Sequence, residues 1–543
     1  MRKNATAFLF LLLFTFTASF SQQTKRSALY DLVIEKRRLN RSNEQVSVFT
    51  PTITPPSAQI NESLSRKNIF MLDRKASTRL FNIKPASITF LFPVNNIDNL
   101  KLELVRQEIN STMDFALGAF EANGIMKTMG SEQGLHYRGY INGDPSSVAC
   151  ISIFRNGDVM GIFCNNTGNY NIGKTSTADD QYLLYNSNDL KAPLIFNCAT
   201  TDSMFKGLEE KIGPPVLRPS VIPPALLCKK VRIFWEADYK LYNNNFGGNF
   251  TNTANYLTGL FNEVSTMYQN EGILIELTDT YIWTTPDPYN TATSSNGLTD
   301  FKARWNGLGN NFKADLAVLI DGSPTNNGGI AYLLTNNLCN RSFAYGYADI
   351  YGSYNSVPVY SWDVEVVTHE MGHMMGSHHT HWCGWNTGVG GTCGAIDNCA
   401  TTESGGSCTS CTATTNTNPT PPAGFNGTVM SYCHLRSGIE INLSNGFGPL
   451  PQNAIRNTIS IASCAIRDNK WTGAVSTAWE DPANWGCGLI PDETTDVTVS
   501  SGLIRYPEIN SGAVCRRLIQ DPVSSVSVRD GFTLMIAGLP ANP

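Results

Sequence analysis

The spacing of apolar residues between positions 231 and 283 changes from one period to another along the chain. Residues 231–239 and 273–283 have the apolar, β-branched and aromatic character that predicts strands. Between them, residues 253–269 carry apolar side chains three and four positions apart, which is the spacing of one helical face. Strands that alternate with helices predict an α/β region.

The same alternation continues towards the C-terminus. We predict a short helix at 298–305, a buried strand at 314–320 and a strand at 329–334 that lies at a sheet edge. The next helix is expected at 363–375. Residues 384–427 are rich in Gly, Thr, Asn, Ser and Cys and predict a long loop that disulfides must hold. We therefore place an α/β (α+β) domain at 226–468.

A different pattern precedes this domain. From Ser87 onwards the chain is strand-like, and VACISIF and VMGIFC flank a good turn signal at 155–158, which predicts a β-hairpin. Cys150 and Cys164 could face each other across that hairpin. The Pro-rich, non-periodic stretch 211–225 marks a boundary. Residues 22–225 are therefore predicted to form a β-rich domain of their own.

The composition changes again after Cys464. Residues 469–543 contain short strand-like runs separated by turn residues, with no long internal repeat, and predict a small β-rich C-terminal module. Cys487 and Cys515 are available to staple this module.

Residues 1–21 have the layout of a secretory signal peptide, with Arg2 and Lys3 before an apolar core and small residues at the end. The alternative is a membrane anchor, for which the apolar run is short. No later stretch is long and apolar enough to cross a bilayer, so we expect a secreted, extracellular protein. The 14 cysteines then indicate disulfides. A net charge of −5 without a basic stripe gives no support for nucleic-acid binding.

Five of the 7 histidines lie within residues 368–381. His369 and His373 are four residues apart, so on a helix they share one face and can bind one metal ion. Glu370 then lies beside the metal, where it can take a proton from water. Gly376 ends the helix in a left-handed conformation, and this bend brings His379 back as a third ligand.

Other interpretations of these residues stay open. The alternatives to a catalytic site are a solvated helix end that is rich in histidine, and a metal-storage site. His378 and His381 fit no ligand spacing, and we expect them at the surface or behind the ligands. Cys408 and Cys411 could form a second metal site or a redox pair, although disulfides are favoured in an exported, cysteine-rich loop.

A second motif follows His379 by about fifty residues, where 427–432 read GTVMSY. Zinc enzymes with the long histidine pattern have a Met-containing turn beneath the metal, which here would contain Met430. On these two motifs the chain resembles the metzincin metallopeptidases, and it is most similar to a secreted bacterial form of the reprolysin-like (adamalysin-type) enzymes with a pro-domain. The resemblance covers about residues 88–465. It implies a catalytic domain with a twisted mixed sheet and an active-site helix.

The chain departs from the reprolysin-like pattern at two positions. Thr380 stands where that family usually has Asp, and Tyr432 lies two residues after the methionine, as in astacins, serralysins and pappalysins. Tyr432 is therefore either an oxyanion stabiliser or a packed tyrosine. A pappalysin- or serralysin-like protease is the alternative within the clan. An alternative of another class is a catalytically weak, metzincin-shaped adhesion or binding protein, which an altered Glu370 or a missing ligand would favour.

The resemblance implies a zinc-dependent endopeptidase that hydrolyses peptide bonds of proteins or peptides and is made as a latent precursor. One catalytic Zn²⁺ is expected, with a structural Ca²⁺ as an additional expectation. Glu370 would pass the proton of water to the leaving amine. The strand at 329–334 would pair with an extended substrate. The pro-domain at 22–225 would act as the inhibitor.

Cys198, in IFNCATT, is the candidate thiolate for the fourth zinc position in the latent form. Both the pro-region and residues 226–465 contain an odd number of cysteines. Cys198 is therefore either free or paired across the boundary, for instance with Cys228. The resemblance further suggests that Cys339 is tied to the C-terminal helix through Cys464.

Overall fold

The computed structural model describes most of the chain after the expected signal peptide. The described residues are 26–39, 43–94, 100–109, 115–121, 124, 126–128, 134–176, 180–192, 198–200, 227–322, 328–335, 338–352, 357–385, 394–403 and 426–538. The expected signal peptide at 1–21, the Pro-rich stretch at 211–225 and the pair Cys408 and Cys411 lie outside these residues.

The first of two large sheets is built from the N-terminal part of the chain and contains ten strands of the described residues. Only the β1–β4 pair is parallel, and its other neighbouring strands pair antiparallel. In spatial order the strands are β1 (Glu44–Val46), β4 (Ser87–Phe92), β5 (Leu100–Arg106), β8 (Leu135–Ile141), β9 (Val148–Ile153), β10 (Val159–Asn165), β11 (Gly168–Lys174), β12 (Gln181–Asn186), β3 (Asn68–Leu72) and β2 (Phe49–Pro51).

The second sheet carries the candidate site, and its central strands are parallel. Its main path runs through β16 (Gly329–Ala331), β17 (Tyr345–Asp349), β15 (Leu316–Asp321), β13 (Lys229–Ala237), β14 (Leu274–Trp283), β6 (Ala116–Phe120) and β7 (Met126–Thr128). The terminal strands β16 and β7 pair antiparallel with their neighbours. The predicted edge position of the strand that begins at Gly329 is confirmed, although that strand ends at Ala331.

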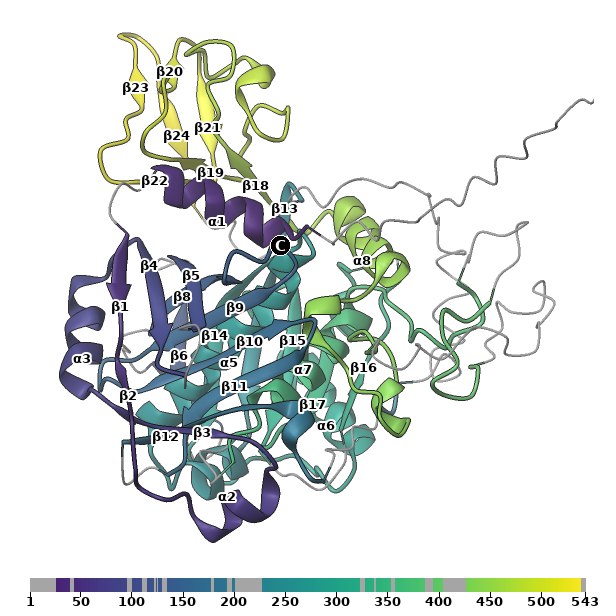
Figure 1. Cartoon of the computed structure of the whole chain (residues 1–543). Helices are drawn as coiled ribbons and strands as arrows, with labels where there is room; N and C mark the ends of the chain where they lie inside the picture. Colours follow the sequence, from purple (N-terminus) through teal and green to yellow (C-terminus); the bar gives the residue numbers. More distant parts are fainter. Residues whose placement is uncertain are drawn as a thin grey trace, which may run out of the picture.

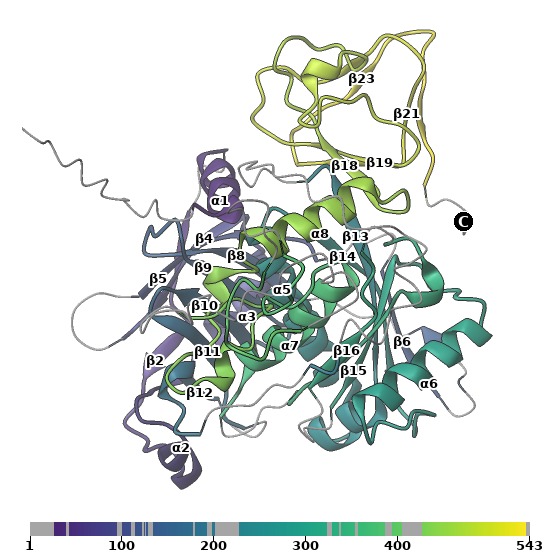
Figure 2. The same ribbon diagram turned by 90° about the vertical axis from the view of Figure 1, so that its right-hand side faces the viewer.

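Helices fill the space between the sheets and cover the far face of the second sheet (Figures 1 and 2). The α-helices are α1 (Ala28–Leu39), α2 (Ala58–Ser63), α3 (Arg74–Ile83), α5 (Phe250–Asn270), α6 (Ser294–Gly307), α7 (Tyr360–Met374) and α8 (Pro449–Ile461). Helices α5 and α7 lie in the middle layer, where apolar residues of both sheets meet them in one core. Helix α6 packs on the opposite face through Leu298, Phe301 and Trp305. The expected α/β class is confirmed.

Two strands of the N-terminal region belong to the second sheet rather than to the first. β6 pairs parallel with β14, from Ala116 opposite Asp279 to Phe120 opposite Trp283, and β7 extends the same edge. The N-terminal region therefore supplies one edge of the sheet whose other edge is β16. It also supplies β9, against which the middle helix α5 packs.

The C-terminal region continues the second sheet instead of standing apart from it. β18 (Ile466–Lys470) pairs with β13, and β19 (Thr495–Val499) and β22 (Arg517–Gln520) follow in parallel. The remaining strands form two further parallel pairs, β20 (Glu508–Ile509) with β23 (Ser527–Val528) and β21 (Ala513–Cys515) with β24 (Leu534–Ile536). Lys230 of β13 links the central strands of the sheet to this C-terminal extension. It forms ion pairs with Glu276 of β14 at 2.6 Å and with Asp496 of β19 at 2.5 Å.

Three disulfides join described cysteines: Cys228–Cys487, Cys339–Cys464 and Cys399–Cys433. The pairing of Cys339 with Cys464 that the resemblance suggested is confirmed. The pairing of Cys198 with Cys228 is wrong, because Cys228 bonds to Cys487. The predicted disulfide between Cys487 and Cys515 is also wrong, because Cys487 bonds to Cys228 and Cys515 is a free, buried thiol.

The predicted hairpin forms between β9 and β10, but its two cysteines stay free. In its register Cys150 lies opposite Ile162, and Cys164 lies opposite Val148. Cys164 is therefore two residues beyond the direct partner of Cys150 and lies diagonally across from it on the same face. At such a diagonal position the two Cα atoms are too far apart for a disulfide. The pairing of Cys150 with Cys164 is therefore wrong.

Within the described ranges, no helix combines the length and the apolar character that spanning a membrane requires.

Candidate active site

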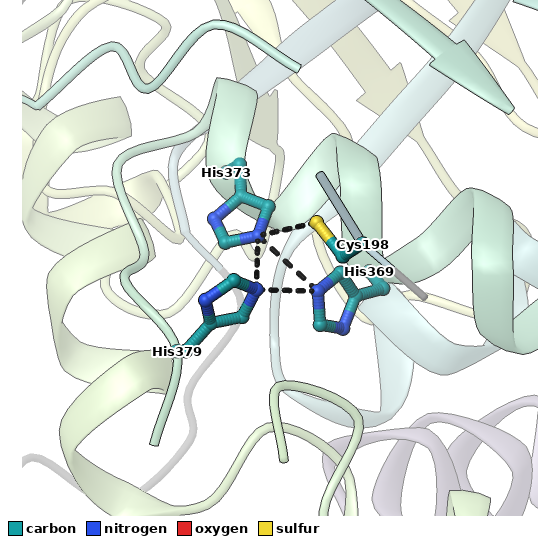
Figure 3. A group of neighbouring side chains, drawn as sticks. All are labelled: Cys198, His369, His373 and His379. Atoms are coloured by element: carbon teal, nitrogen blue, oxygen red, sulfur yellow. Dashed lines mark hydrogen bonds between the residues drawn. The ribbon is translucent and has the colours of Figure 1, made fainter. Parts of the chain in front are cut away.

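Three histidine rings meet at one point beneath the end of α7 (Figure 3). His369 and His373 lie one turn apart on α7, and His379 follows the end of the helix. Nε2 of His373 lies 3.2 Å from Nε2 of His369 and 3.1 Å from Nε2 of His379. The third separation, between His369 and His379, is also 3.1 Å.

The opposite nitrogen of each ring faces a hydrogen-bond acceptor. Nδ1 of His369 donates to the Val429 carbonyl at 2.7 Å, and Nδ1 of His373 donates to the Ser377 carbonyl at 2.7 Å. Nδ1 of His379 faces Oε1 of Glu403 at 2.9 Å. A neutral imidazole has a single N–H, so all three Nε2 atoms present lone pairs to the shared point.

Burial keeps these rings neutral. It lowers the pKa of His369 to about 3, and burial together with the neighbouring histidines lowers the pKa of His373 and His379. Three converging lone pairs repel one another unless a cation lies between them. Nitrogens 3.1–3.2 Å apart can all reach one ion at about the 2.0–2.1 Å of a zinc–nitrogen bond. The donor set therefore fits Zn²⁺.

The bend after α7 depends on a glycine. The helix ends at Met374, and Gly376 has a φ of +94°. Its N–H donates to the His373 carbonyl at 2.8 Å, and the Ser377 N–H donates to the Gly372 carbonyl at 3.0 Å. A side chain at Gly376 would meet Thr458 and be strained at this φ. This turn carries the chain from α7 back to His379.

Glu370 is fully buried beside the cluster. Burial raises the pKa of its carboxyl to about 8. Oε2 accepts a hydrogen bond from Thr200 Oγ1 at 3.4 Å, whereas Oε1 has no hydrogen-bond partner among the described residues. Gly329 of β16 packs against this carboxyl so closely that a methyl group in its place would overlap Glu370. The carboxyl is thus held between the edge strand and the histidines.

A short piece of the N-terminal region occupies the site. Sγ of Cys198 lies 3.6 Å from Nε2 of His373, and together with the three histidines it makes a four-residue group that could hold a metal ion (Figure 3). The same piece pairs with β16: Cys198 forms a parallel bridge to Gly329, and the Ala199 N–H donates to the Gly329 carbonyl at 2.8 Å. Thr200 Oγ1 accepts from the Ala331 N–H at 2.9 Å.

The turn that contains Met430 lies directly below the histidines. Met430 is fully buried and packs against Gly372 of α7, and the Thr380 N–H donates to its carbonyl at 3.0 Å. The preceding Val429 carbonyl holds the His369 ring. Tyr432 follows, with its hydroxyl donating to the Cys198 carbonyl at 2.8 Å and its ring centroid 4.8 Å from that of His379.

Glu403 also contacts the site, although it lies in a loop without a motif and no sequence pattern predicts it. Its carboxylate is 2.9 Å from Nδ1 of His379 and 3.2 Å from Nε2 of His381. The surface alternative for His378 and His381 is wrong, because both are buried. His378 stacks on Trp382 with ring centroids 3.6 Å apart, and His381 lies behind the His379 ring.

The expectation of structural calcium gains no support. The groups of described residues that could hold a metal all contain histidine or cysteine: the cluster with Cys198, the group of His379, His381 and Glu403, and the group of Asp397, Cys399 and Cys433. Calcium prefers six to eight oxygen ligands. Cys399 and Cys433 are moreover joined to each other by a disulfide.

Of the comparisons with known proteins, only the family model bears on this chemistry. A search of curated proteins finds no match. A solved structure titled "Structure of a chaperone-substrate complex" is 16% identical and has a TM-score of 0.25, so the likeness carries no argument. That match covers 43% of this chain and only 35% of the other chain. The family model of metallo-peptidase family M12, of reprolysin type, matches residues 228–434. Over residues 228–434 the chain is therefore similar to the reprolysin-like metallopeptidases.

Proposed function

We propose that the chain is the latent precursor of a secreted, zinc-dependent endopeptidase. The observation that carries this proposal is the convergence of three neutral Nε2 atoms at 3.1–3.2 Å from one another. We assign 1–21 to a signal peptide, 22–225 to a pro-domain, 226–468 to the catalytic domain and 469–543 to a C-terminal module. The family match to metallo-peptidase family M12 supports the catalytic assignment.

In this proposal His369, His373 and His379 hold the zinc ion. A bound zinc ion supplies a Lewis acid that polarises a peptide carbonyl and makes water more acidic. The acceptors behind the rings (the Val429 and Ser377 carbonyls and the Glu403 carboxylate) fix each ring so that Nε2 faces the ion. A preorganised set of rings needs no rearrangement when the metal binds.

Glu370 is the proton carrier. Its carboxyl would accept a proton from the attacking water and deliver it to the leaving amine. Burial raises the pKa of this carboxyl to about 8, and a cation bound at the histidines would lower it towards the range of a group that accepts a proton near neutral pH. Oε1 of Glu370 has no hydrogen-bond partner among the described residues, so it is available to a water molecule.

The outer edge of β16 would hold the substrate main chain. In the precursor Cys198 is paired with Gly329, the Ala199 N–H donates to the Gly329 carbonyl, and the Ala331 N–H donates to Thr200 Oγ1. These are the groups that an extended peptide pairs with when it adds to a sheet edge. Tyr432, once free of the Cys198 carbonyl, could donate its hydroxyl to the oxyanion of the substrate.

Latency would follow from the same contacts. Cys198 offers its sulfur to the fourth metal position, which a hydrolytic zinc site must leave open. Further contacts hold the pro-domain on the catalytic domain: Asn171 of β11 pairs with Ser361 of α7, and Asn169 pairs with Leu443. The pro-domain therefore blocks both the metal and the substrate edge.

Metal removal and restoration test the proposal. The activated protein should lose cleavage of a denatured protein when a chelator removes its zinc, and regain it with about one equivalent of Zn²⁺. A His373→Ala variant is the matched control, and it should fail to regain activity at the same zinc concentration. Cleavage that continues in the metal-free protein would contradict the assignment.

A further inference from the structure

A cavity of about 570 Å³ borders the active-site helix and the segment that follows Tyr432. Its lining includes Ser361, Trp362 and Glu365 of α7 and residues 434–441. Glu365 precedes His369 by four residues, so it lies one turn away on the same helical face. The cavity is therefore one helical turn from the histidine cluster and has the size of a ligand pocket.

Two carboxylates line this cavity. The Glu365 side chain is 12% exposed, and Nδ1 of His434 lies 3.7 Å from its Oε1. Oε2 of Glu440 accepts a hydrogen bond from Ser187 Oγ at 3.4 Å. In the part of the chain that the structure describes, neither carboxylate forms an ion pair with Lys or Arg. Arg436 also borders the cavity, but its guanidinium donates to the carbonyls of Cys399 and Asn398.

Because no Lys or Arg among the described residues balances their charge, both carboxyl groups have a raised pKa. Burial, and then the Glu440 carboxylate, raise the pKa of Glu365 to about 8. Burial also raises the pKa of Glu440. A cation placed between them would offset this cost, because an opposite charge favours the ionised form of a carboxyl.

The remainder of the lining suits a long, apolar stem. Trp362, Ile439 and Ile441 border the cavity beside the carboxylates. Lysine and arginine side chains bury their methylene groups against apolar surface while the charged end finds polar partners. An acidic pocket with apolar walls therefore fits these two side chains better than a leucine or a glutamate.

Resting on the proposed endopeptidase function, we propose that this cavity is a specificity pocket for an arginine or lysine of the substrate next to the scissile bond. Glu365 and Glu440 are its counter-charges. Asn169, Ser187 and Leu190 of the N-terminal region complete the lining, and Ser187 bonds to Glu440. The pro-domain thus covers the pocket in the precursor, and its removal opens the pocket together with the metal site.

Peptide pairs that differ only in arginine or citrulline test this pocket, because citrulline keeps the shape and removes the charge. We place the residue on either side of the scissile bond and use the protein after activation by limited proteolysis. On one side, kcat/KM should be at least 10-fold higher for arginine. The Glu365→Gln and Glu440→Gln variants should each reduce this ratio severalfold, whereas Glu493→Gln, an exposed carboxylate elsewhere, should leave it unchanged.

A binding measurement separates failure of the pocket from failure of the proposed function. In zinc-loaded Glu370→Ala protein, the arginine peptide should bind with a Kd at least 10-fold lower than the citrulline peptide. Such a preference without any cleavage by the wild type would support the pocket and contradict the endopeptidase. Equal kcat/KM or equal Kd for the two peptides would overturn the pocket, and so would a preference that survives in the Glu365→Gln/Glu440→Gln double variant.

Discussion

The sulfur of Cys198 lies 3.6 Å from Nε2 of His373, although 175 residues separate them in the chain. Burial raises the pKa of this thiol, and the Glu370 carboxyl raises it further. A divalent cation at the histidines acts in the opposite sense, because metal binding favours the thiolate. The thiol and the three imidazoles together make the four-ligand set that a closed zinc site uses.

Replacing Cys198 by serine should therefore release part of the latency. A serine hydroxyl stays protonated at neutral pH and is a much weaker zinc ligand than a thiolate. We expect the uncut Cys198→Ser precursor to hydrolyse peptides at least 10-fold faster than the uncut wild type. Cys515→Ser, which changes another free thiol far along the chain, is the control. Equal latency of wild type and Cys198→Ser would rule out the thiolate switch.

Glu403 should control metal affinity without touching the metal. Its carboxylate orients His379 through Nδ1 at 2.9 Å, and partners of this kind typically change metal affinity by about 10–100-fold. We expect Glu403→Ala to weaken zinc binding by this amount in a chelator competition assay. His381→Gln leaves the hydrogen bond between Glu403 and His379 in place, so this variant should weaken zinc binding less than Glu403→Ala does. A zinc Kd for Glu403→Ala within twofold of the wild type would contradict this role.

Gly329 should be essential for the position of the base. A methyl group at this position would overlap the Glu370 carboxyl, so either β16 or Glu370 must move. Displacements of about 1 Å can cost about 10²-fold in rate. Gly329→Ala should thus lose about this much peptide hydrolysis while keeping its zinc. Gly307→Ala, where an added methyl meets nothing within 4 Å, is the matched control. Normal hydrolysis by Gly329→Ala would refute the close fit.

Lowering the pH should reduce the folding stability of the precursor, because His136 of β8 is buried in its neutral form. Burial, and then Arg138, lower the pKa of this histidine to about 3, against about 6.5 in an unfolded chain. Between these two values the unfolded state binds more protons, so the free energy of unfolding falls as the pH drops below about 6.5.

The effect can be measured by urea denaturation of the precursor at pH 6.5 and 4.5. His136 should account for about 2–3 kcal/mol of the loss over these two units, since each unit corresponds to about 1.4 kcal/mol. His136→Gln, which has no charge to gain, should show a loss smaller by this amount. The contributions of other groups that titrate in both proteins, such as Glu263, cancel when the two losses are subtracted. An equal loss of unfolding free energy in the wild type and the variant would show that His136 does not titrate as expected.

Local patterns in the sequence were sufficient to predict most of the central strands of the second sheet and the convergence of the three histidines. The apolar periodicity predicted β13, α5 and β14, and the motif spacing brought His369, His373 and His379 together. β17 was missed because its sequence YGYAD alternates tyrosines with small residues and has no aliphatic run.

Features that depend on distant parts of the chain could not be read in the same way. No local signal indicates that β6 joins the second sheet, because the register with β14 is set by packing between segments over 150 residues apart. The same holds for Cys228 and Cys487, which are 259 residues apart. Glu403 reaches His379 from a loop whose course is fixed by tertiary contacts rather than by periodicity.

In the proposed mechanism three histidines hold a zinc ion and Glu370 carries the proton. The most direct measurement compares activated wild type with Glu370→Ala for zinc content and for cleavage of a denatured protein. Both proteins should bind about one zinc ion, because Glu370 is not a ligand, and only the wild type should cleave. Equal cleavage by both proteins, or the absence of zinc from both, would contradict the account.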